Sequence, residues 1–270
     1  MESCAPMLVV LKESAQEVGQ EAARIVAGAV RAKPSIVLGL ATGSTPLGMY
    51  EELVVLHRAG KLDFSKATSF NLDEYLGLAP NDPQSFHYFM HSNFFSHVNF
   101  APDSIHIPDG AMRKDFSAYC ESYERAIKNA GGIDLQVLGI GRNGHIGFNE
   151  PNSSLASRTR LKELTQETIE DNRRFFPPGA EIPECAITMG IGTILDARRI
   201  VILATGKSKA AAVAKAIEGP ISSSVSASAL QLHPDVIFII DDDASYALAQ
   251  RDYYRRVLEL TKKYTPEKLA

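Results

Sequence analysis

Short apolar runs alternate with amphipathic stretches along nearly the whole chain. Apolar residues recur with the spacing of one helical face after Ser14, and they follow a helix-like pattern over residues 86–95, 115–128, 208–217 and 246–261. Between these stretches lie apolar runs with the length of buried strands, at residues 7–11, 35–40, 67–70, 104–107, 135–138, 200–203 and 236–240.

Two of the predicted helices have start signals in the sequence. Ser14 and Glu17 form the capping box S-x-x-E, in which the two side chains bond backbone N–H groups of the first turn. Pro46 follows the second apolar run, and proline favours the first turn of a helix. We therefore expect helices to begin at these two places.

The alternation of strands and helices predicts the fold class. It indicates parallel βαβ units, and hence a Rossmann-like, doubly wound α/β fold whose mainly parallel sheet is covered by helices on both faces. The chain has 270 residues, of which 45% are apolar, and no stretch rich in Pro, Gly or Ser divides it. We expect a single domain over residues 1–270.

One segment departs from the regular pattern. Residues 165–183 are polar and irregular, and they include Arg174 and the pair Pro177 and Pro178. This composition is typical of a mobile lid over a site, extending over about 161–183, and it is equally typical of a surface helix followed by a loop.

Composition and charge argue against several classes of protein. No apolar stretch is long enough to span a bilayer, and the net charge of −4 argues against nucleic acid as the main partner. Residues 1–6 lack the features of a secretion signal, so we expect a cytoplasmic protein. Cys4, Cys120 and Cys185 are odd in number and widely spaced, which predicts reduced thiols rather than disulfides or a zinc site. A catalytic cysteine is a minor alternative.

The carboxyl ends of the strands are the places to look for a site. In a parallel sheet, ligands gather at this edge. The rule points to the loops at residues 41–45, 71–75, 139–150 and 205–209. The first three of these loops carry chemically informative sequences.

The first loop, L-A-T-G-S-T-P at residues 40–46, has features of a phosphate site. Gly43 lets the backbone approach a ligand closely. Hydroxyl groups stand on Thr42, Ser44 and Thr45, and the following helix directs its free N–H groups to the same place. The spacing and the lysine of a Walker A loop are absent. On this segment alone, a plain strand-to-helix turn is an equally good interpretation.

The second loop, F-N-L-D-E-Y-L-G-L at residues 70–78, places two acids just past the end of a strand. Asp73 or Glu74 can act as a general base if its surroundings exclude water. Without further context, a pair of solvated acids is the more frequent meaning of this pattern.

The third loop spans residues 138–151 and contains the spacing G-x-G-x-x-G of a dinucleotide site. Such a site needs a helix at the last glycine, yet Gly147 and Pro151 disfavour one, and no strand ending in an acid follows. We interpret the glycines as a tight loop that exposes His145 and Glu150, whose spacing does not fit the metal motif H-E-x-x-H. A core histidine with a capping glutamate is the alternative.

Taken together, these segments resemble the glucosamine-6-phosphate deaminase family. The match runs from Met7 to Leu260 and depends on L-A-T-G-S-T-P, F-N-L-D-E-Y-L-G-L, G-R-N-G-H-I-G-F-N-E-P, S-S-L-A-S-R-T-R and A-L-Q-L-H-P-D, in this order. The resemblance implies conversion of glucosamine 6-phosphate and water to fructose 6-phosphate and ammonia, with no metal ion or organic cofactor. It also implies a Rossmann-like fold without a nucleotide site.

The resemblance assigns catalytic roles to the second and third loops. Asp73 matches the base that moves a proton between C2 and C1 of the opened sugar, and one carboxylate can serve both carbons. His145 matches the group that helps to open the pyranose ring, and Glu150 matches its partner. Asn143 stands where the family often has aspartate. An amide can hydrogen-bond but carries no charge, so we expect Glu150 to be the main ionic partner of His145.

The resemblance also implies where the 6-phosphate binds. A cation on the suspected lid would couple substrate binding to closure, because the contact forms only with ligand present. The residues that match the family's phosphate cradle are Thr42, Gly43, Ser44, Thr45, Lys209 and Arg174.

Regulation is a further implication of the resemblance. The residues that match the effector site for N-acetylglucosamine 6-phosphate in allosteric members are Ser153, Arg160, Lys162 and Tyr254. That site lies between the subunits of a hexamer and uses the N-terminus, where this chain has six residues before Met7. We expect a homo-oligomer, with a hexamer favoured, and we treat effector binding as a hypothesis. An ordinary basic surface strip is the alternative for Arg160 and Lys162.

Three rival functions are compatible with parts of the pattern. A 6-phosphogluconolactonase shares the fold and a similar glycine-rich loop, but it needs no proton transfer at C2, so Asp73 together with F-N-E-P favours the deaminase. A sugar-phosphate sensor of transcription would need a DNA-binding module, for which we expect no room before Met7. An inactive relative is disfavoured because Asp73, His145 and Glu150 occur together.

Overall fold

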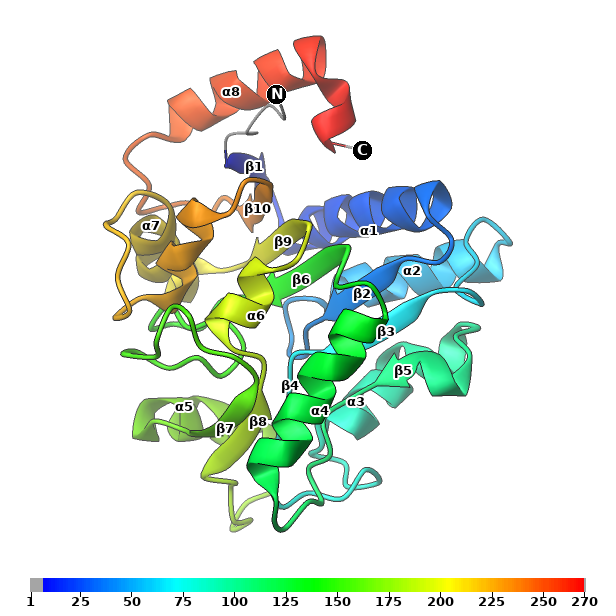
Figure 1. Ribbon diagram of the computed structural model, residues 1–270. Coiled ribbons are helices and arrows are strands. Elements are labelled where there is room, and N and C mark those ends of the chain that lie inside the picture. The colour runs from blue at the N-terminus through cyan, green and yellow to red at the C-terminus, as the bar shows by residue number, and fades with distance from the viewer. Residues whose placement is uncertain (1–6, 270) are drawn as a thin grey trace.

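The computed structural model describes residues 7–269. Its main feature is a seven-stranded parallel sheet in the order β1-β10-β9-β6-β2-β3-β5 (Figure 1). Every strand of this sheet lies on one of the apolar runs, so the predicted α/β fold is confirmed. The strands are β1 (Leu8–Lys12), β2 (Val37–Leu40), β3 (Thr68–Asn71), β5 (Ile105–His106), β6 (Leu135–Gly139), β9 (Arg199–Ala204) and β10 (Val236–Asp241).

Helices cover both faces of this sheet. One face packs against α1 (Ala15–Ala32), α2 (Leu47–Arg58) and α3 (Phe86–Asn93). The opposite face packs against α4 (Phe116–Asn129), α6 (Ile191–Leu195) and α7 (Ala210–Ile217). The remaining helices are α5 (Gln166–Asn172), α8 (Arg251–Tyr264) and the 3-10 turns η1 (Phe95–His97), η2 (Pro102–Ser104), η3 (Arg173–Phe175), η4 (Lys207–Lys209), η5 (Ser226–Leu232) and η6 (Pro266–Leu269).

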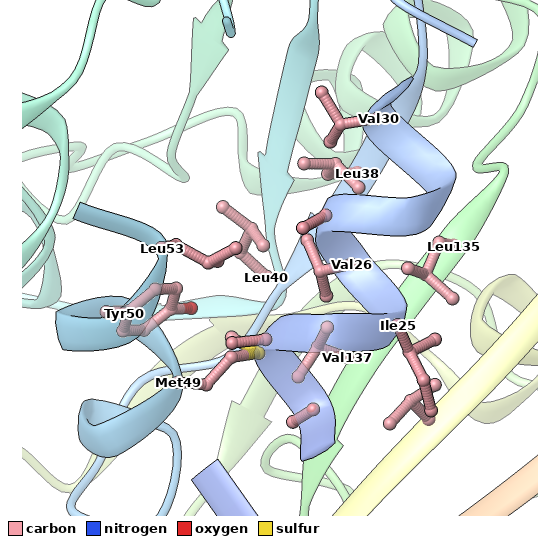
Figure 2. Close-up of a cluster of buried hydrophobic side chains, with 14 of the residues drawn as sticks. Ile25, Val26, Val30, Leu38, Leu40, Met49, Tyr50, Leu53, Leu135 and Val137 are labelled. Carbon is pink, nitrogen blue, oxygen red and sulfur yellow. The ribbon is translucent and has the colours of Figure 1, made fainter. Parts of the chain in front are cut away.

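The alternation of side chains along the strands builds the two apolar layers. On β6, Leu135 and Val137 face α1, whereas Leu138 faces the opposite layer. Figure 2 shows the first layer, in which Ile25 of α1 lies near Leu135. Full burial of a side chain such as Ile25 stabilises the fold by about 2 kcal/mol. The strand ends that carry the loops are therefore held by packed layers on both sides.

The start of α1 agrees with the predicted capping box in part. The backbone N–H of Glu17 donates to Ser14 Oγ at 3.3 Å. The Glu17 carboxylate accepts from the N–H of Glu13 at 3.2 Å, one residue before the position that a regular capping box would use. Ser14 therefore caps the helix as predicted, but the N–H that the Glu17 carboxylate accepts belongs to Glu13 instead of Ser14.

The predicted bounds of the last helix, 246–261, are wrong. Helix α8 begins at Arg251 because the preceding residues form a turn. The Glu218 carboxylate holds that turn by accepting the backbone N–H groups of Ala249 and Gln250, each at 2.9 Å. A side chain distant in sequence thus decides where this helix begins.

A second, smaller sheet did not appear in the sequence pattern. It is antiparallel, in the order β4-β8-β7, and consists of β4 (Asp73–Tyr75), β8 (Cys185–Thr188) and β7 (Arg160–Glu163). Residues 71–75 were expected to be a loop, but β4 extends β3 after a single residue, Leu72. Asp73 pairs with Thr188 in this sheet. The short strands and the charged sequence R-L-K-E of β7 hide them from an apolar pattern.

The suspected lid contains a helix and a loop. Helix α5 starts after Thr165, whose hydroxyl accepts the N–H of Thr168 at 3.3 Å, and η3 and an irregular segment follow. Residues 160–163, at the expected lower bound, are paired in β7. The mobility of the remaining segment stays a prediction.

Other predictions concern cysteines and ligands. Cys120 and Cys185 are free thiols, and Cys4 lies outside the described residues. No helix among residues 7–269 combines the length and apolarity needed to cross a membrane. Within the same range, no group of three or more His, Cys, Asp or Glu side chains is arranged to hold a metal ion.

Candidate active site

A cavity of about 410 Å³ lies at the carboxyl edge of the parallel sheet. Its walls come from the loops that follow β2, β3, β6 and β9, which are the loops that the strand-end rule indicated. The start of α3 and residues 172–176 complete the wall. The predicted residues that line it are Thr42, Gly43, Ser44, Thr45, Asp73, His145, Arg174 and Lys209.

Asp73 is the first residue of β4 and only 6% exposed. Its position follows from Leu72, which donates its N–H to the carbonyl of Leu40 at 3.1 Å and accepts the N–H of Met189 at 2.7 Å. Burial, and next the charge of Glu74, raises the pKa of Asp73 to about 8. The two acids are therefore not a solvated pair, and Asp73 is a strong base once it is ionised.

The glycine-rich loop after β6 lies against Asp73. Gly147 has φ +55°, and a methyl group there would lie 2.9 Å from Thr188 Oγ1 and 3.4 Å from Asp73 Oδ2. Gly141 donates its N–H to the carbonyl of His145 at 2.8 Å, and a methyl group on Gly141 would overlap the imidazole ring. These glycines therefore give the loop room to pack against Asp73 and to place the imidazole of His145 on the cavity that Asp73 also lines.

Glu150 and Asn143 both contact His145. Asn143 Oδ1 accepts the backbone N–H of His145 at 3.1 Å, and Asn143 Nδ2 donates to Glu150 Oε2 at 3.1 Å. Glu150 Oε2 lies 3.6 Å from His145 Nδ1. Burial opposes the charge of Glu150, but hydrogen bonds from His145, Thr168 and Asn143 outweigh it and lower the pKa to about 2. Glu150 is thus a buried carboxylate rather than a helix cap, and His145 borders the cavity.

Another part of the cavity wall is rich in hydrogen-bond donors. Residues 42–45 precede α2, whose first turn presents free N–H groups. Gly43 has φ +99°, and no atom lies within 4 Å of the position that a side chain would occupy, so the backbone is open to a ligand. Pro46 is the residue before α2 rather than its first residue. This arrangement favours a phosphate site over a plain turn.

Two cations, Lys209 and Arg174, also line this cavity. Burial, together with the nearby charges of Arg174 and Arg142, lowers the pKa of Lys209, while Asp171 opposes this effect. The guanidinium carbon of Arg174 lies 4.7 Å from the ring centre of Phe175, and its side chain is largely exposed. A phosphate in this position would relieve the mutual repulsion of the cations.

Comparison with known proteins identifies the family of this chain. A model of the family described as Glucosamine-6-phosphate isomerases/6-phosphogluconolactonase matches residues 11–238. The chain belongs to this family. It is 50% identical to the glucosamine-6-phosphate deaminase of Thermoanaerobacter pseudethanolicus, over 91% of this chain and 97% of that protein. Identity to the deaminase of Shewanella loihica is 53%, over 93% of this chain and 92% of the relative.

Solved structures of the glucosamine-6-phosphate isomerase/6-phosphogluconolactonase family agree with this fold. A monomeric glucosamine-6-phosphate deaminase superposes with a TM-score of 0.87 at 47% identity, covering 89% of this chain and all (100%) of that chain. The 6-phosphogluconolactonase of Trypanosoma cruzi has a TM-score of 0.70 at 18% identity, covering 90% of this chain and 97% of its own. The second likeness shows the fold alone.

The residues that match the family's effector site are only partly brought together. Arg160 donates to Ser153 Oγ at 3.1 Å, and Lys162 follows on the same strand, where it pairs with Glu163 at 3.2 Å. Tyr254 lies on α8, far from β7 in Figure 1, and its hydroxyl bonds the Glu218 carboxylate at 3.2 Å. Within one chain, therefore, Tyr254 does not join the other three.

Two features of the candidate site were not predicted from the sequence. Arg142 of the glycine-rich loop bonds Asp171 of α5, with Nε and Oδ2 at 2.7 Å, and so ties the loop to the suspected lid. An aromatic wall lines the cavity, with members at Tyr75, Phe86, Phe148 and Phe176. The motif G-R-N-G-H contains Arg142, but nothing in the sequence indicates that Asp171 is its partner. The aromatic residues are spread over a hundred positions, so no local spacing connects them.

Proposed function

We propose that this chain is a glucosamine-6-phosphate deaminase, which converts glucosamine 6-phosphate and water to fructose 6-phosphate and ammonia. The observation that carries the proposal is one cavity lined by a buried carboxyl, an imidazole, a donor-rich loop and two cations. Two relatives named glucosamine-6-phosphate deaminase are identical to this chain at about half of the aligned residues, and each alignment covers more than nine-tenths of the chain.

The first step is binding of the phosphate. In the proposal, residues 42–45 and the start of α2 donate N–H and hydroxyl groups, and Lys209 and Arg174 supply charge. This contact is remote from the bonds that change, so its binding energy orients the sugar carbons against Asp73 and His145.

Ring opening is the task of His145. The imidazole transfers the proton between the anomeric hydroxyl and the ring oxygen, which leaves an open-chain aldehyde. The Glu150 carboxylate, close to Nδ1, stabilises the ring while it carries the extra proton. Asn143 contributes hydrogen bonds to both residues without adding a charge.

Asp73 then carries out the isomerisation. Its carboxylate takes the proton from C2, and the resulting enediol-type intermediate recovers a proton at C1 from the same group. The nitrogen on C2 becomes an imine, to which water adds. One proton of that water passes to the nitrogen as its oxygen bonds C2, the other follows as the C–N bond breaks, and ammonia leaves fructose 6-phosphate. Ammonia and ketose phosphate form in equal amounts.

An assay of ammonia and fructose 6-phosphate tests this function. We expect both products in a one-to-one ratio from glucosamine 6-phosphate, and neither from the Asp73→Asn variant. The same preparations are given 6-phosphogluconolactone as an alternative substrate. Acid release from the lactone, with no ammonia from the amino sugar, would overturn the proposal and identify a lactonase.

Regulation, assembly and location complete the proposal. Ser153, Arg160 and Lys162 form a polar group that suits N-acetylglucosamine 6-phosphate as an effector, and a second subunit of a homohexamer would supply Tyr254. The relative solved as a monomer is a precedent for the opposite outcome. Light scattering gives the assembly, and a saturation curve that ignores the effector would reject regulation. Free Cys120 and Cys185 support a cytoplasmic enzyme.

A further inference from the structure

A turn that is distant in sequence packs against the glycine-rich loop after β6. This turn is the start of η5, at Ser226 and Ala227. The hydroxyl of Ser226 donates to the carbonyl of Asn149 at 2.7 Å, and it lies 3.4 Å from the carbonyl of Gly144. The backbone N–H of Ala227 donates to the same Gly144 carbonyl at 3.0 Å. The proposed mechanism has no role for either residue of this turn.

The two carbonyls are those that precede two proposed catalytic side chains. Gly144 comes directly before His145, and Asn149 comes directly before Glu150. Because a peptide group is planar, a bond that fixes a carbonyl also fixes the N and Cα atoms of the next residue. The start of η5 therefore restrains the backbone atoms that carry the imidazole and those that carry the carboxylate.

Contact between the turn and the loop is close. Gly144 has φ +88°, and a methyl group there would lie 2.6 Å from Val225 Cγ1. Ser226 is 1% exposed, so its hydrogen bond is shielded from water. Ser226 does not belong to the residues that line the cavity. Its hydroxyl can therefore influence a bound sugar only through the loop.

The middle of the loop has separate restraints. The side-chain amide of Asn149 donates to the carbonyls of Ile146 and Met189, each at 2.8 Å, and accepts from Arg160 at 2.9 Å. The backbone carbonyl of Asn149 instead accepts from Ser226. Loss of the Ser226 hydroxyl would take this donor from a buried carbonyl while the amide stays anchored. We therefore expect a local shift of the loop rather than its unfolding.

The contact between His145 and Glu150 is sensitive to such a shift. Glu150 Oε2 lies 3.6 Å from His145 Nδ1, which is slightly longer than a good hydrogen bond. A movement on the order of half an ångström in either backbone would close this contact or lose it. The position of the two backbone segments thus decides how well the carboxylate supports the imidazole.

We propose that Ser226 is a positioning residue of the candidate active site, which fixes the carbonyls before His145 and Glu150 and thereby sets the separation of imidazole and carboxylate. The two segments are held by one turn, so the imidazole keeps the orientation that proton transfer to the sugar requires. The inference rests on the proposed role of His145 in opening the sugar ring.

Kinetics of Ser226→Ala test this inference. The variant lacks the hydroxyl but keeps the proposed phosphate-binding residues at 42–45, Arg174 and Lys209. We expect kcat for ammonia release from glucosamine 6-phosphate to fall about tenfold or more, with KM within about twofold of the wild-type value. An unchanged kcat, or a loss that appears in KM alone, would overturn the inference.

Ser228→Ala is the matched control. Ser228 lies two residues later in η5 and is fully buried, and its hydroxyl bonds the N–H of Ser222 at 2.8 Å and the carbonyl of Ser222 at 3.1 Å. Both variants lose a buried hydroxyl, so we expect similar falls in melting temperature. Only Ser226→Ala should lower kcat. Equal losses of kcat in the two variants would show a structural role alone and overturn the inference.

NMR without substrate separates this inference from the proposed function. The ring ¹⁵N signals of His145 and the carboxyl ¹³C signal of Glu150 are identified by their loss in His145→Gln and Glu150→Gln. We expect these signals to shift in Ser226→Ala and to stay in Ser228→Ala. Shifted signals in a protein that releases no ammonia would keep the positioning role and reject the deaminase. Unchanged signals in a protein that releases ammonia would reject the positioning role and keep the deaminase.

A second variant keeps the test decisive if Ser226→Ala does not fold. Ser226→Cys retains a side chain of similar shape, but a thiol is a weak hydrogen-bond donor. We expect kcat and the NMR signals of His145 and Glu150 to change in the same direction as in the alanine variant. Wild-type kcat together with wild-type signals in Ser226→Cys would overturn the inference.

Discussion

Two groups of charged side chains at the candidate site hold their charges in different ways. Asp73 and Glu150 are both buried, yet burial and Glu74 raise the pKa of Asp73 to about 8, whereas hydrogen bonds lower that of Glu150 to about 2. In contrast, Arg174 is exposed and Lys209 is half-buried. Surrounding groups thus set the proton affinities of the two carboxyls, and the two cations stay available for a ligand.

Removal of the Asp73 carboxylate should have the largest effect. Asp73→Asn is expected to lower kcat by about 10³-fold or more, because a positioned general base contributes about 10²–10⁴-fold and this base acts twice. Steady-state ammonia release measures the change. Binding of fructose 6-phosphate should persist, since the proposed phosphate-binding residues are unchanged. Loss of product binding in a folded variant would contradict this division of roles.

The same variant should be more stable than the wild type at alkaline pH. The native pKa of Asp73 is raised above its unfolded value, so ionising this group costs native stability as pH rises from about 4 to about 8. Asp73→Asn removes that cost, which is on the order of a few kcal/mol above pH 8. Melting temperatures of both proteins between pH 5 and pH 9 provide the check. A gap that does not widen with pH would show that Asp73 is not a strained carboxylate.

The pH profile should separate the two buried carboxylates. Only ionised Asp73 is a base, so kcat/KM should fall about tenfold for each pH unit below about 8. Glu150 stays ionised throughout this range, so it should add no inflection between pH 5 and pH 9. A flat profile from pH 6 to pH 8 would contradict the raised pKa of Asp73.

Loss of a cation should affect binding more than chemistry. Lys209→Met is expected to raise KM about 30-fold with a smaller change in kcat, because a charge-assisted contact to phosphate is lost. Competitive inhibition by inorganic phosphate should weaken in parallel. Lys207→Met, an exposed neighbour outside the cavity, is the control. Equal effects in the two variants would remove Lys209 from the phosphate site.

The smallest effect is expected where an amide replaces a charge. Asn143→Asp should change kcat by less than about tenfold, since Glu150 already supplies the carboxylate next to His145. The added charge would raise the pKa of Glu150 from about 2, but Asp73 sets the acid side of the profile, so that side should stay at the same pH. Wild-type and variant kcat values measured against pH test this. An inactive wild type that only the aspartate restores would show that Glu150 alone is insufficient.

The large sheet and the small sheet differ in how far the sequence predicts them. The parallel strands β2, β6, β9 and β10 are buried on both faces, so they appear as apolar runs such as V-I-F-I-I-D in β10. Strand β7 has the sequence R-L-K-E and is only half-buried, so its pattern is that of a loop. The small sheet depends on pairing between β4 and β8, which are more than a hundred residues apart.

Local motifs determined much of the candidate site. The loop L-A-T-G-S-T-P, Asp73 and G-H-I-G-F-N-E-P each follow a parallel strand, and parallel strands end at one edge, so their convergence follows from the order of elements. Glycine at positions 141 and 147 was informative because only a residue without a side chain fits beneath the imidazole and beside Asp73.

Only the tertiary structure decided the proton affinities and the contacts between distant segments. The sequence D-E shows two acids, but the completed fold buries both, bonds Glu74 to the N-terminus of α3 and raises the pKa of Asp73 to about 8. The physical reason is that strand order and apolar packing are encoded over a few residues. The pKa of a carboxyl depends instead on every group that the completed fold brings near it or excludes with the water.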